Sequence, residues 1–332
     1  MKLKREVKMR NSLYLFVLLT LLACSSQKKQ RELLEQSKPA WLKQRPVNSD
    51  YYYGIGIAPK VGAAMLFEDK AKEKALADIS SQINSTIQAE AIFYQVEDKQ
   101  GVKEYLQNRI KSTSAEYLEG YEYLDKWEDL SNTYAFYRLS KQKHKEVKIR
   151  RKNEALKMAS DKYLMGISRL SNGQHVAAIE HFALVIDALS GYLNESTVAD
   201  VQGKKIDLVS ESTREINTIV RGLNFISDVE TAGFETCYIV CDAQKKSVSN
   251  MPVQLKYSGA YLVNDRIKTD HRGKISLPHL SATNNTVDNA LVVQIDLVSL
   301  GRQVTRNLYV RKIIEQQKAS EVVVKITKQG HS

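Results

Sequence analysis

An uncharged segment near the N-terminus constrains this chain more than any other feature, because it determines where the mature protein begins and in which compartment it folds. Residues 13–23 carry no charge and follow a basic head formed by Lys2, Lys4, Arg5, Lys8 and Arg10. A helix of this length would rise only about 16 Å, whereas the hydrocarbon core of a bilayer is about 30 Å thick. The pattern is typical of an export signal rather than of a transmembrane helix. We therefore expect residues 1–23 to be a signal peptide.

The export segment ends in the motif Leu21, Leu22, Ala23 and Cys24. This motif resembles the lipobox of bacterial lipoproteins, although Leu22 is bulkier than the usual residue at its position. The resemblance implies that a signal peptidase recognises Leu21, Leu22 and Ala23. It also implies cleavage before Cys24 and attachment of lipid to its thiol. Two or three acyl chains such as palmitate would make the anchor effectively permanent, since each buried CH₂ contributes about 0.8 kcal/mol. The alternative is an ordinary signal peptide, or a buried apolar segment, in which the cysteine stands by chance.

The residues after Cys24 indicate which membrane receives the protein. Neither an aspartate nor an acidic cluster follows the cysteine. By the sorting rule of well-studied diderm bacteria, this favours the outer membrane, with the body of the protein facing the periplasm. Residues 24–48 are polar and contain Pro39 and Pro46, so we expect them to form a tether between the lipid and the first folded domain.

Cleavage before Cys24 removes part of the positive charge of the chain. Five basic residues and one acidic residue are lost, so the net charge falls from +11 to +7. Much of the excess that remains lies in residues 141–157, and the rest of the chain is nearly neutral, which argues against a nucleic-acid partner. Five residues of this stretch are candidates for contact with anionic lipid headgroups or with an acidic partner. They are Lys145, Lys148, Arg150, Arg151 and Lys152. The simpler interpretation is a solvated helix face.

Residues 49–141 have the pattern of a small α+β module. The run from Tyr51 to Ala58 predicts a strand, and Gly54 and Gly56 within it indicate that another element approaches closely. The two glycines lie inside the strand and a third is missing, which argues against a dinucleotide-binding loop. Apolar residues at spacings of three and four, with alanine at successive turns, predict a helix over about residues 62–83 that packs on a sheet. Further elements are expected as a strand at 87–94, a helix at 102–114 and a hairpin of strands at 117–127 and 133–140.

The first module resembles a known family. Its motifs are Pro39-Ala40-Trp41, then Tyr52-Tyr53-Gly54-Ile55-Gly56-Ile57-Ala58, then a helix punctuated by Ala71, Ala75 and Ala77. Together they look like the Lpp-twenty family of outer-membrane lipoproteins, and they also resemble the N-terminal module of flagellar assembly protein T. The resemblance covers roughly residues 39–140. It implies a small sheet with helices on one face, a role in envelope assembly and no catalytic residues.

Residues 142–230 have a helical pattern. Met165-Gly166, Ala178 and Phe182 match one tetratricopeptide unit in register, with Gly173 at the turn. Small residues at 166 and 178 would let two antiparallel helices approach closely, and Phe182 would fill the crossing. No second copy is convincing, so a single helical hairpin is favoured over a peptide-binding array. Residues 211–226 are expected to form a further amphipathic helix.

Residues 231–328 have the pattern of a β-sandwich, with strand-like runs at 236–241, 253–257, 274–277, 291–297, 303–310 and 321–326. The run from Thr269 to Leu277 resembles a hairpin of bacterial immunoglobulin-like and carboxypeptidase-regulatory-like domains. In that hairpin the aspartate, here Asp270, binds turn amides, and the glycine, here Gly273, takes a positive φ.

Cys237 and Cys241 share one predicted strand. Their Cα atoms would lie roughly 13 Å apart there, which is too far for a disulfide. Both side chains project on the same face, so we expect a buried pair of small apolar groups. Metal binding would need further ligands nearby, and the sequence shows none.

The sequence contains no recognisable catalytic or metal-binding motif. It lacks His-Glu-x-x-His, Gly-x-Ser-x-Gly and a phosphate-binding loop. His175 and His181 are six residues apart on an expected helix, so they do not form a metal-binding pair at i and i+4. The acidic cluster at residues 116–129 is most simply a solvated strand face.

These features predict an α+β protein that is not an enzyme and that needs neither cofactor nor metal. We expect an outer-membrane lipoprotein that acts as an interaction or assembly module for envelope proteins or peptidoglycan-associated machinery. The first alternative is an activator that docks on a membrane-bound cell-wall synthase. The least favoured alternative is a hydrolase with an unrecognised site.

Overall fold

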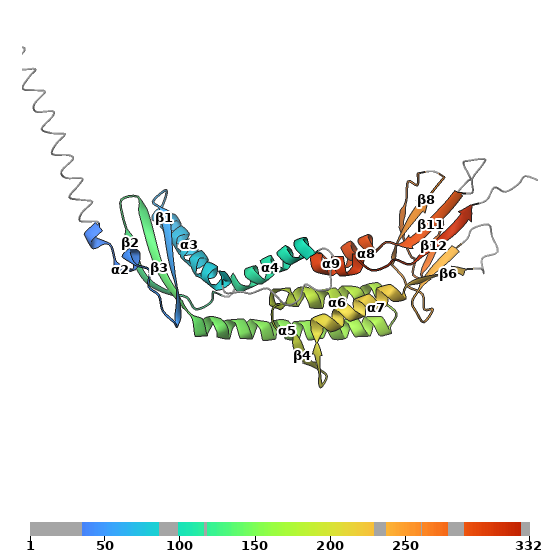
Figure 1. The fold of residues 1–332 in the computed structure, drawn as a ribbon, viewed down its shortest axis with the longest axis horizontal. Coiled ribbons are helices and arrows are strands. Elements are labelled where there is room, and N and C mark those ends of the chain that lie inside the picture. The colour runs from blue at the N-terminus through green and yellow to red at the C-terminus, as the bar shows by residue number, and fades with distance from the viewer. Residues whose placement is uncertain are drawn as a thin grey trace, which may run out of the picture. The chain divides into compact units, whose positions relative to one another are not determined.

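The computed structural model describes residues 35–85, 99–115, 118–228, 237–259, 261–277 and 289–326. They form helices and antiparallel sheets, which confirms the expected α+β class (Figure 1). They also divide into two compact units. Residues 35–85 and 118–147 form the first unit, and the described residues within 99–115 and 148–326 form the second. The motif around Cys24 and the strand expected at 87–94 lie outside the described residues.

The first unit is built on a three-stranded antiparallel sheet with strand order β1-β3-β2. Its elements are α2 (Ala40–Lys43), β1 (Tyr51–Pro59), α3 (Ala64–Ser85), β2 (Glu122–Glu128), β3 (Asn132–Ser140) and the first residues of α5 (Lys141–Ser171). The strand, helix and hairpin predicted for this part of the chain are therefore confirmed, although β2 begins at Glu122 and not at residue 117.

Helix α3 packs against one face of the sheet at backbone-to-backbone distance. A Cβ atom built on Gly54 would collide with the carbonyl oxygen of Ala75, and one built on Gly56 would collide with that of Ala71. Ala71 and Ala75 are themselves buried. Two glycines on the strand and two alanines on the helix thus permit a contact that larger side chains would block, which confirms the predicted close approach.

The second unit contains most of the helices. They are α4 (Lys99–Ala115), the rest of α5, α6 (His175–Leu189), the 3₁₀-helix η2 (Ser190–Tyr192), α7 (Leu208–Gly222), α8 (Leu297–Val304) and α9 (Leu308–Glu315). The helix predicted at 102–114 was expected within the first module, but as α4 it packs on η2 and α9 of the second unit. Val102, Leu106 and Ile110, one turn apart, are buried in this contact.

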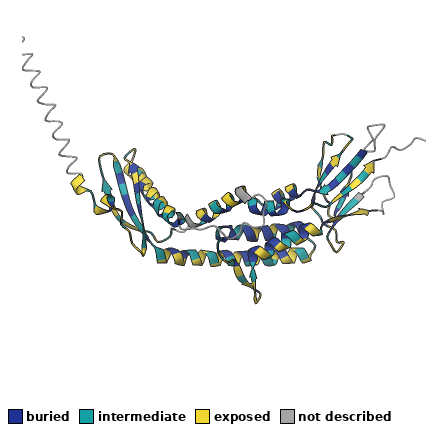
Figure 2. Ribbon diagram, viewed as in Figure 1, coloured by how far each residue is buried: buried dark blue, intermediate teal, exposed yellow. Residues whose placement is uncertain are grey.

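The predicted hairpin of α5 and α6 is confirmed in detail. Gly173, with φ of +74°, lies at the turn between the helices. A Cβ on Gly166 would come within 2.6 Å of the Phe182 ring, so only glycine fits at the crossing. Ala178 and Phe182 are fully buried, and Figure 2 shows buried residues along most of α6. A short β-hairpin follows, made of β4 (Val198–Val201) and β5 (Lys204–Asp207).

Two antiparallel sheets occupy the C-terminal part, with strand orders β10-β7-β6 and β12-β11-β8-β9. The strands are β6 (Asn224–Asp228), β7 (Cys237–Cys241), β8 (Pro252–Tyr257), β9 (Arg266–Lys268), β10 (Lys274–Ser276), β11 (Asn289–Ile295) and β12 (Glu321–Ile326). As predicted, Asp270 Oδ1 accepts hydrogen bonds from the amides of Arg272 and Lys274, and Gly273 has φ of +73°. Cys241 is buried as a free thiol.

Two predictions for this region were wrong. The strand expected at residues 303–310 is replaced by the end of α8 and the start of α9. Each helix has a side-chain N-cap, since Asp296 accepts from the Ser299 amide and Asn307 from the Tyr309 amide. Capping of this kind outweighs the weak strand preference of the β-branched residues between. The amphipathic helix expected to reach Ile226 ends at Gly222, and Ile226 belongs to β6.

Candidate functional site

The sheet of the first unit presents aromatic side chains on the face opposite α3. Because side chains alternate along a strand, the neighbours of Gly54 and Gly56 point away from that helix. The aromatic residues of this second face are Tyr51, Tyr53, Trp127, Tyr134 and Phe136. The ring centroids of Tyr53 and Phe136 lie 5.6 Å apart, and those of Trp127 and Tyr134 lie 5.2 Å apart. These five residues, with Ile55 and Ile57, are called the aromatic face below.

Trp41 covers part of the aromatic face. Its ring stacks on Phe136 with 4.8 Å between centroids and an interplanar angle of 9°. Its Nε1–H donates a hydrogen bond to Asp125 Oδ2 at 2.8 Å, and only 8% of the residue is exposed. Trp41 lies in α2, within the segment that the sequence assigned to the tether. The end of that segment is therefore part of the folded unit, a role that a tryptophan in an otherwise polar stretch could have indicated.

The rest of the aromatic face is partly open. Tyr51 and Tyr53 are half-buried, and Ile57 is 43% exposed. The guanidinium of Arg138 lies 4.4 Å from the centroid of the Tyr51 ring and forms an ion pair with Glu122. The surface thus combines flat aromatic and aliphatic area with a charged rim.

Side chains of α3 seal the free edge of β1. The amide of Ile55 donates to Asp78 Oδ2 at 3.0 Å, and Gln82 Nε2 donates to the carbonyl oxygen of Tyr53 at 2.7 Å. Arg45 forms an ion pair with the same Asp78 carboxylate. Because these two backbone groups are already hydrogen-bonded, they are not available to pair with an additional strand.

Two of the described acidic residues of the first hairpin, Glu128 and Asp129, form ion pairs and turn hydrogen bonds that stabilise the fold. Lys60 and Lys126 both bind Glu128, at 2.6 and 3.0 Å, and their hydrogen bonds lower the pKa of that carboxyl. Burial raises the pKa of Asp129, but hydrogen bonds from the backbone amides of Ser131 and Asn132 outweigh this effect and lower it. Glu128 thus forms ion pairs with two lysines, and Asp129 accepts hydrogen bonds from the amides of the turn.

The five candidate basic residues on α5 divide into two groups. Lys148 and Lys152 both bind Glu195, at 2.5 and 2.8 Å. Burial raises the pKa of Glu195, and the two lysine hydrogen bonds overcome this and lower it. Two of the five charges are therefore used within the second unit, a pairing across more than forty residues that no local pattern indicates. Lys145, Arg150 and Arg151 are exposed, and Arg150 lies 4.0 Å from Glu154 one turn further along the helix.

The anchor motif Leu21, Leu22, Ala23 and Cys24 lies outside the described residues. Within the described ranges, no helix combines the length and apolar character needed to cross a bilayer. The same ranges hold no group of three His, Cys, Asp or Glu side chains arranged to bind a metal ion.

The first unit therefore belongs to a class of small α+β modules, in which one helix covers one sheet face and a tryptophan from the preceding segment covers part of the other. Residues 39–141 match the model of the LPP20 lipoprotein family. The match contains Trp41, the glycine-bearing strand β1, helix α3 and the whole sheet. It supports the predicted family resemblance and points to a lipoprotein of the cell envelope. No significant match was found among curated proteins or among solved structures.

Proposed function

We propose that this chain is a non-enzymatic lipoprotein of the outer membrane, anchored through lipid on Cys24, whose body binds envelope proteins or peptidoglycan-associated machinery in the periplasm. The observation that carries the proposal is the match of residues 39–141 to a lipoprotein family, which begins fifteen residues after the predicted lipid attachment site.

The attachment of Trp41 to the sheet gives the tether a defined end. Fifteen peptide units separate Cys24 from Pro39, and a fully extended chain of that length reaches roughly 50 Å. The aromatic face is thus confined to a thin layer next to the membrane. Confinement raises the effective concentration of the module toward any partner in the same layer, without a new contact.

The aromatic face is the surface best suited to a protein partner. Tyrosine, tryptophan, phenylalanine and arginine are enriched at protein interfaces, and the open part of the face offers Tyr51, Tyr53, Ile57 and Arg138. The carboxylates near it already have partners, since Glu122 pairs with Arg138, Asp125 accepts from Trp41 and Glu128 pairs with two lysines, so the arrangement favours binding over acid–base chemistry.

Cross-linking in intact cells tests the proposal. A photoreactive amino acid is placed at Ile57, which is 43% exposed, and as a matched control at Val198 in β4, which is 44% exposed. We expect adducts with a distinct envelope protein from position 57, none of them from position 198, and fewer from position 57 when Cys24→Ala removes the anchor. Equal adduct yields with and without the anchor would show that tethering plays no part in binding.

A further inference from the structure

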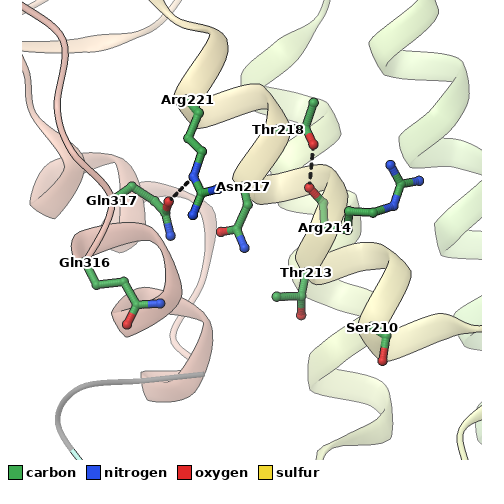
Figure 3. A pocket seen from close by; sticks show the side chains of 8 residues that line it. All are labelled: Ser210, Thr213, Arg214, Asn217, Thr218, Arg221, Gln316 and Gln317. Atoms are coloured by element: carbon green, nitrogen blue, oxygen red, sulfur yellow. Dashed lines mark hydrogen bonds between the residues drawn. The ribbon is translucent and has the colours of Figure 1, made fainter. Parts of the chain in front are cut away.

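A polar pocket lies between α7 and the C-terminal end of α9 in the second unit (Figure 3). Its volume is about 440 Å³, and all the residues that line it have polar side chains. Pockets for small ligands commonly measure 300–1,000 Å³, so the space suits a molecule of sugar or dipeptide size.

Three residues of α7 form a stripe along one wall of the pocket. Thr213, Asn217 and Arg221 follow one another at intervals of four and therefore lie on one side of the helix. Figure 3 shows Thr213 and Asn217 pointing toward Gln316 and Gln317 at the end of α9.

Two buried polar atoms of this stripe have no partner. Thr213 is only 3% exposed, yet its Oγ1 makes no hydrogen bond with any described residue, and the same holds for Asn217 Oδ1. Leaving a buried donor or acceptor unpaired costs about 1–3 kcal/mol. Both residues line the pocket, so an occupant that reaches these two atoms would supply the missing hydrogen bonds.

The charge of the pocket comes from Arg221. Its Nε donates to Gln317 Oε1 at 2.8 Å, and within the described chain no carboxylate forms an ion pair with its guanidinium. The second arginine of the lining, Arg214, is held by Glu211 and Glu215 at 2.7 Å each. Among the described residues, the pocket thus has one guanidinium without an ion pair, which is bonded to Gln317 through Nε only, beside two unpaired neutral polar groups.

We propose that this pocket binds a small carboxylate-bearing ligand, with Arg221 holding the carboxylate and Thr213 and Asn217 hydrogen-bonding a neighbouring hydroxyl or amide. A guanidinium matches the geometry of a carboxylate through two parallel N–H···O bonds. The chemistry fits both a sugar acid and the C-terminus of a short peptide. The choice of cell-wall fragments as probes rests on the proposed periplasmic function. The proposal that the pocket binds a carboxylate does not depend on that function.

Binding is measured by saturation-transfer NMR on the full mature lipoprotein in detergent. The probes are N-acetylmuramic acid, N-acetylglucosamine, which lacks the lactyl ether that carries the carboxylate, and N-acetyl-alanyl-alanine. We expect the first or the third to bind at least tenfold more tightly than N-acetylglucosamine, and which of the two binds identifies the source. No binding by either carboxylate probe, or equal binding of N-acetylglucosamine, would overturn the proposal.

Ligand-binding measurements on arginine variants distinguish a ligand site from a polar patch that only stabilises the fold. Arg221→Gln should reduce carboxylate binding at least tenfold and abolish the preference over N-acetylglucosamine. Arg221→Lys should have an intermediate effect, because it keeps the charge and loses the fork. The matched control is Arg302→Gln in α8, which replaces an exposed arginine outside the pocket lining and should leave binding unchanged. If Arg302→Gln weakens binding as much as Arg221→Gln, the assigned carboxylate contact is wrong.

Thr213→Val gives a readout independent of the arginine. The change removes an unpaired hydroxyl at nearly constant shape, so the free protein should melt at the same or a higher temperature while ligand affinity falls. A lower melting temperature with unchanged affinity would show that the hydroxyl serves the fold and not a ligand. Lipid attachment to Cys24 is unaffected by any of these results, so failure of the pocket and failure of the proposed function are distinguishable.

Discussion

At the scale of single residues, Trp41 connects the sequence outside the sheet to the fold itself. It stacks on Phe136, binds Asp125 and is nearly buried. The residue belongs to a polar segment that composition assigns to a linker, yet its ring is held as firmly as a core side chain. The segment before β1 is therefore fixed to the first unit by this aromatic contact as well as by the ion pair of Arg45 with Asp78.

Trp41→Ala should destabilise the first unit strongly. Truncation of a buried tryptophan costs about 3–5 kcal/mol, and the stack on Phe136 and the bond to Asp125 are lost with it. Urea unfolding followed by circular dichroism measures the change. Trp127→Ala serves as the control, because Trp127 is only partly buried and its loss should cost less. Equal costs for both variants would contradict the packing described for Trp41.

In the second unit, His175 links two distant segments of the chain, as Trp41 does in the first unit. It is 4% exposed, and its ring nitrogens lie 2.9 Å from the carbonyl oxygen of Gly173 and 2.9 Å from Asp242 Oδ2. It therefore joins the turn of the helical hairpin to the end of β7.

His175→Ala should lower the free energy of unfolding by about 2–4 kcal/mol, since it leaves a largely buried carboxylate with fewer partners. A double-mutant cycle with Asp242→Ala measures the direct coupling, which we expect to be about 1 kcal/mol or more. Strict additivity of the two substitutions would refute the contact.

At the scale of secondary-structure elements, the closest packing in the first unit is that of α3 on β1. Gly56→Ala should destabilise this unit by about 1–3 kcal/mol or more, because the added methyl meets the backbone of Ala71, which cannot rotate away. The matched control is Gly301→Ala in α8, where the nearest atom would be 3.6 Å away and helix propensity improves by up to about 1 kcal/mol. Thermal unfolding of both variants checks the prediction, and a neutral Gly56→Ala would disprove the close approach.

The ion pairs of Lys148 and Lys152 on α5 with Glu195 should make the free energy of unfolding depend on pH in the acidic range. The pKa of Glu195 is lowered in the folded chain, so the ion pair stabilises the protein above the ordinary glutamate pKa of 4.5 and is lost as the pH falls through the lowered value. The double variant Lys148→Met/Lys152→Met should be less stable than wild type at pH 6, and the gap should narrow below pH 4.5. Lys145→Met is the control and should follow wild type throughout. A gap that stays constant with pH would exclude this linkage.

The sequence predicted those elements whose signals are local. Alternation and glycine placement predicted β1, the alanine pattern predicted α3, and Gly166 with Phe182 predicted the helix crossing. The strand predicted at residues 303–310 was wrong, because the N-caps Asp296 and Asn307 stabilise two short helices there in spite of the β-branched residues. The placement of α4, the Lys148 and Lys152 contacts with Glu195, and the stripe facing Gln317 depend on residues far apart in the chain, so no local pattern contains them.

At the scale of the whole molecule, the account assigns different tasks to different parts. The N-terminal segment is proposed to carry the lipid, the first unit matches the LPP20 lipoprotein family model and carries the aromatic face, and the described part of the second unit holds a polar pocket with one arginine outside any ion pair. Each unit can be tested without the other. All parts act at a membrane, however, only if Cys24 is the first residue of the mature protein and carries lipid.

Metabolic labelling with a clickable fatty acid tests this requirement most directly. The wild-type protein and Cys24→Ala are expressed in the native cell, recovered, and compared for label, membrane fractionation and the mass of the N-terminal peptide. The account predicts a labelled wild type that begins at Cys24 and an unlabelled Cys24→Ala variant. An unlabelled wild-type chain whose N-terminus lies elsewhere would contradict it.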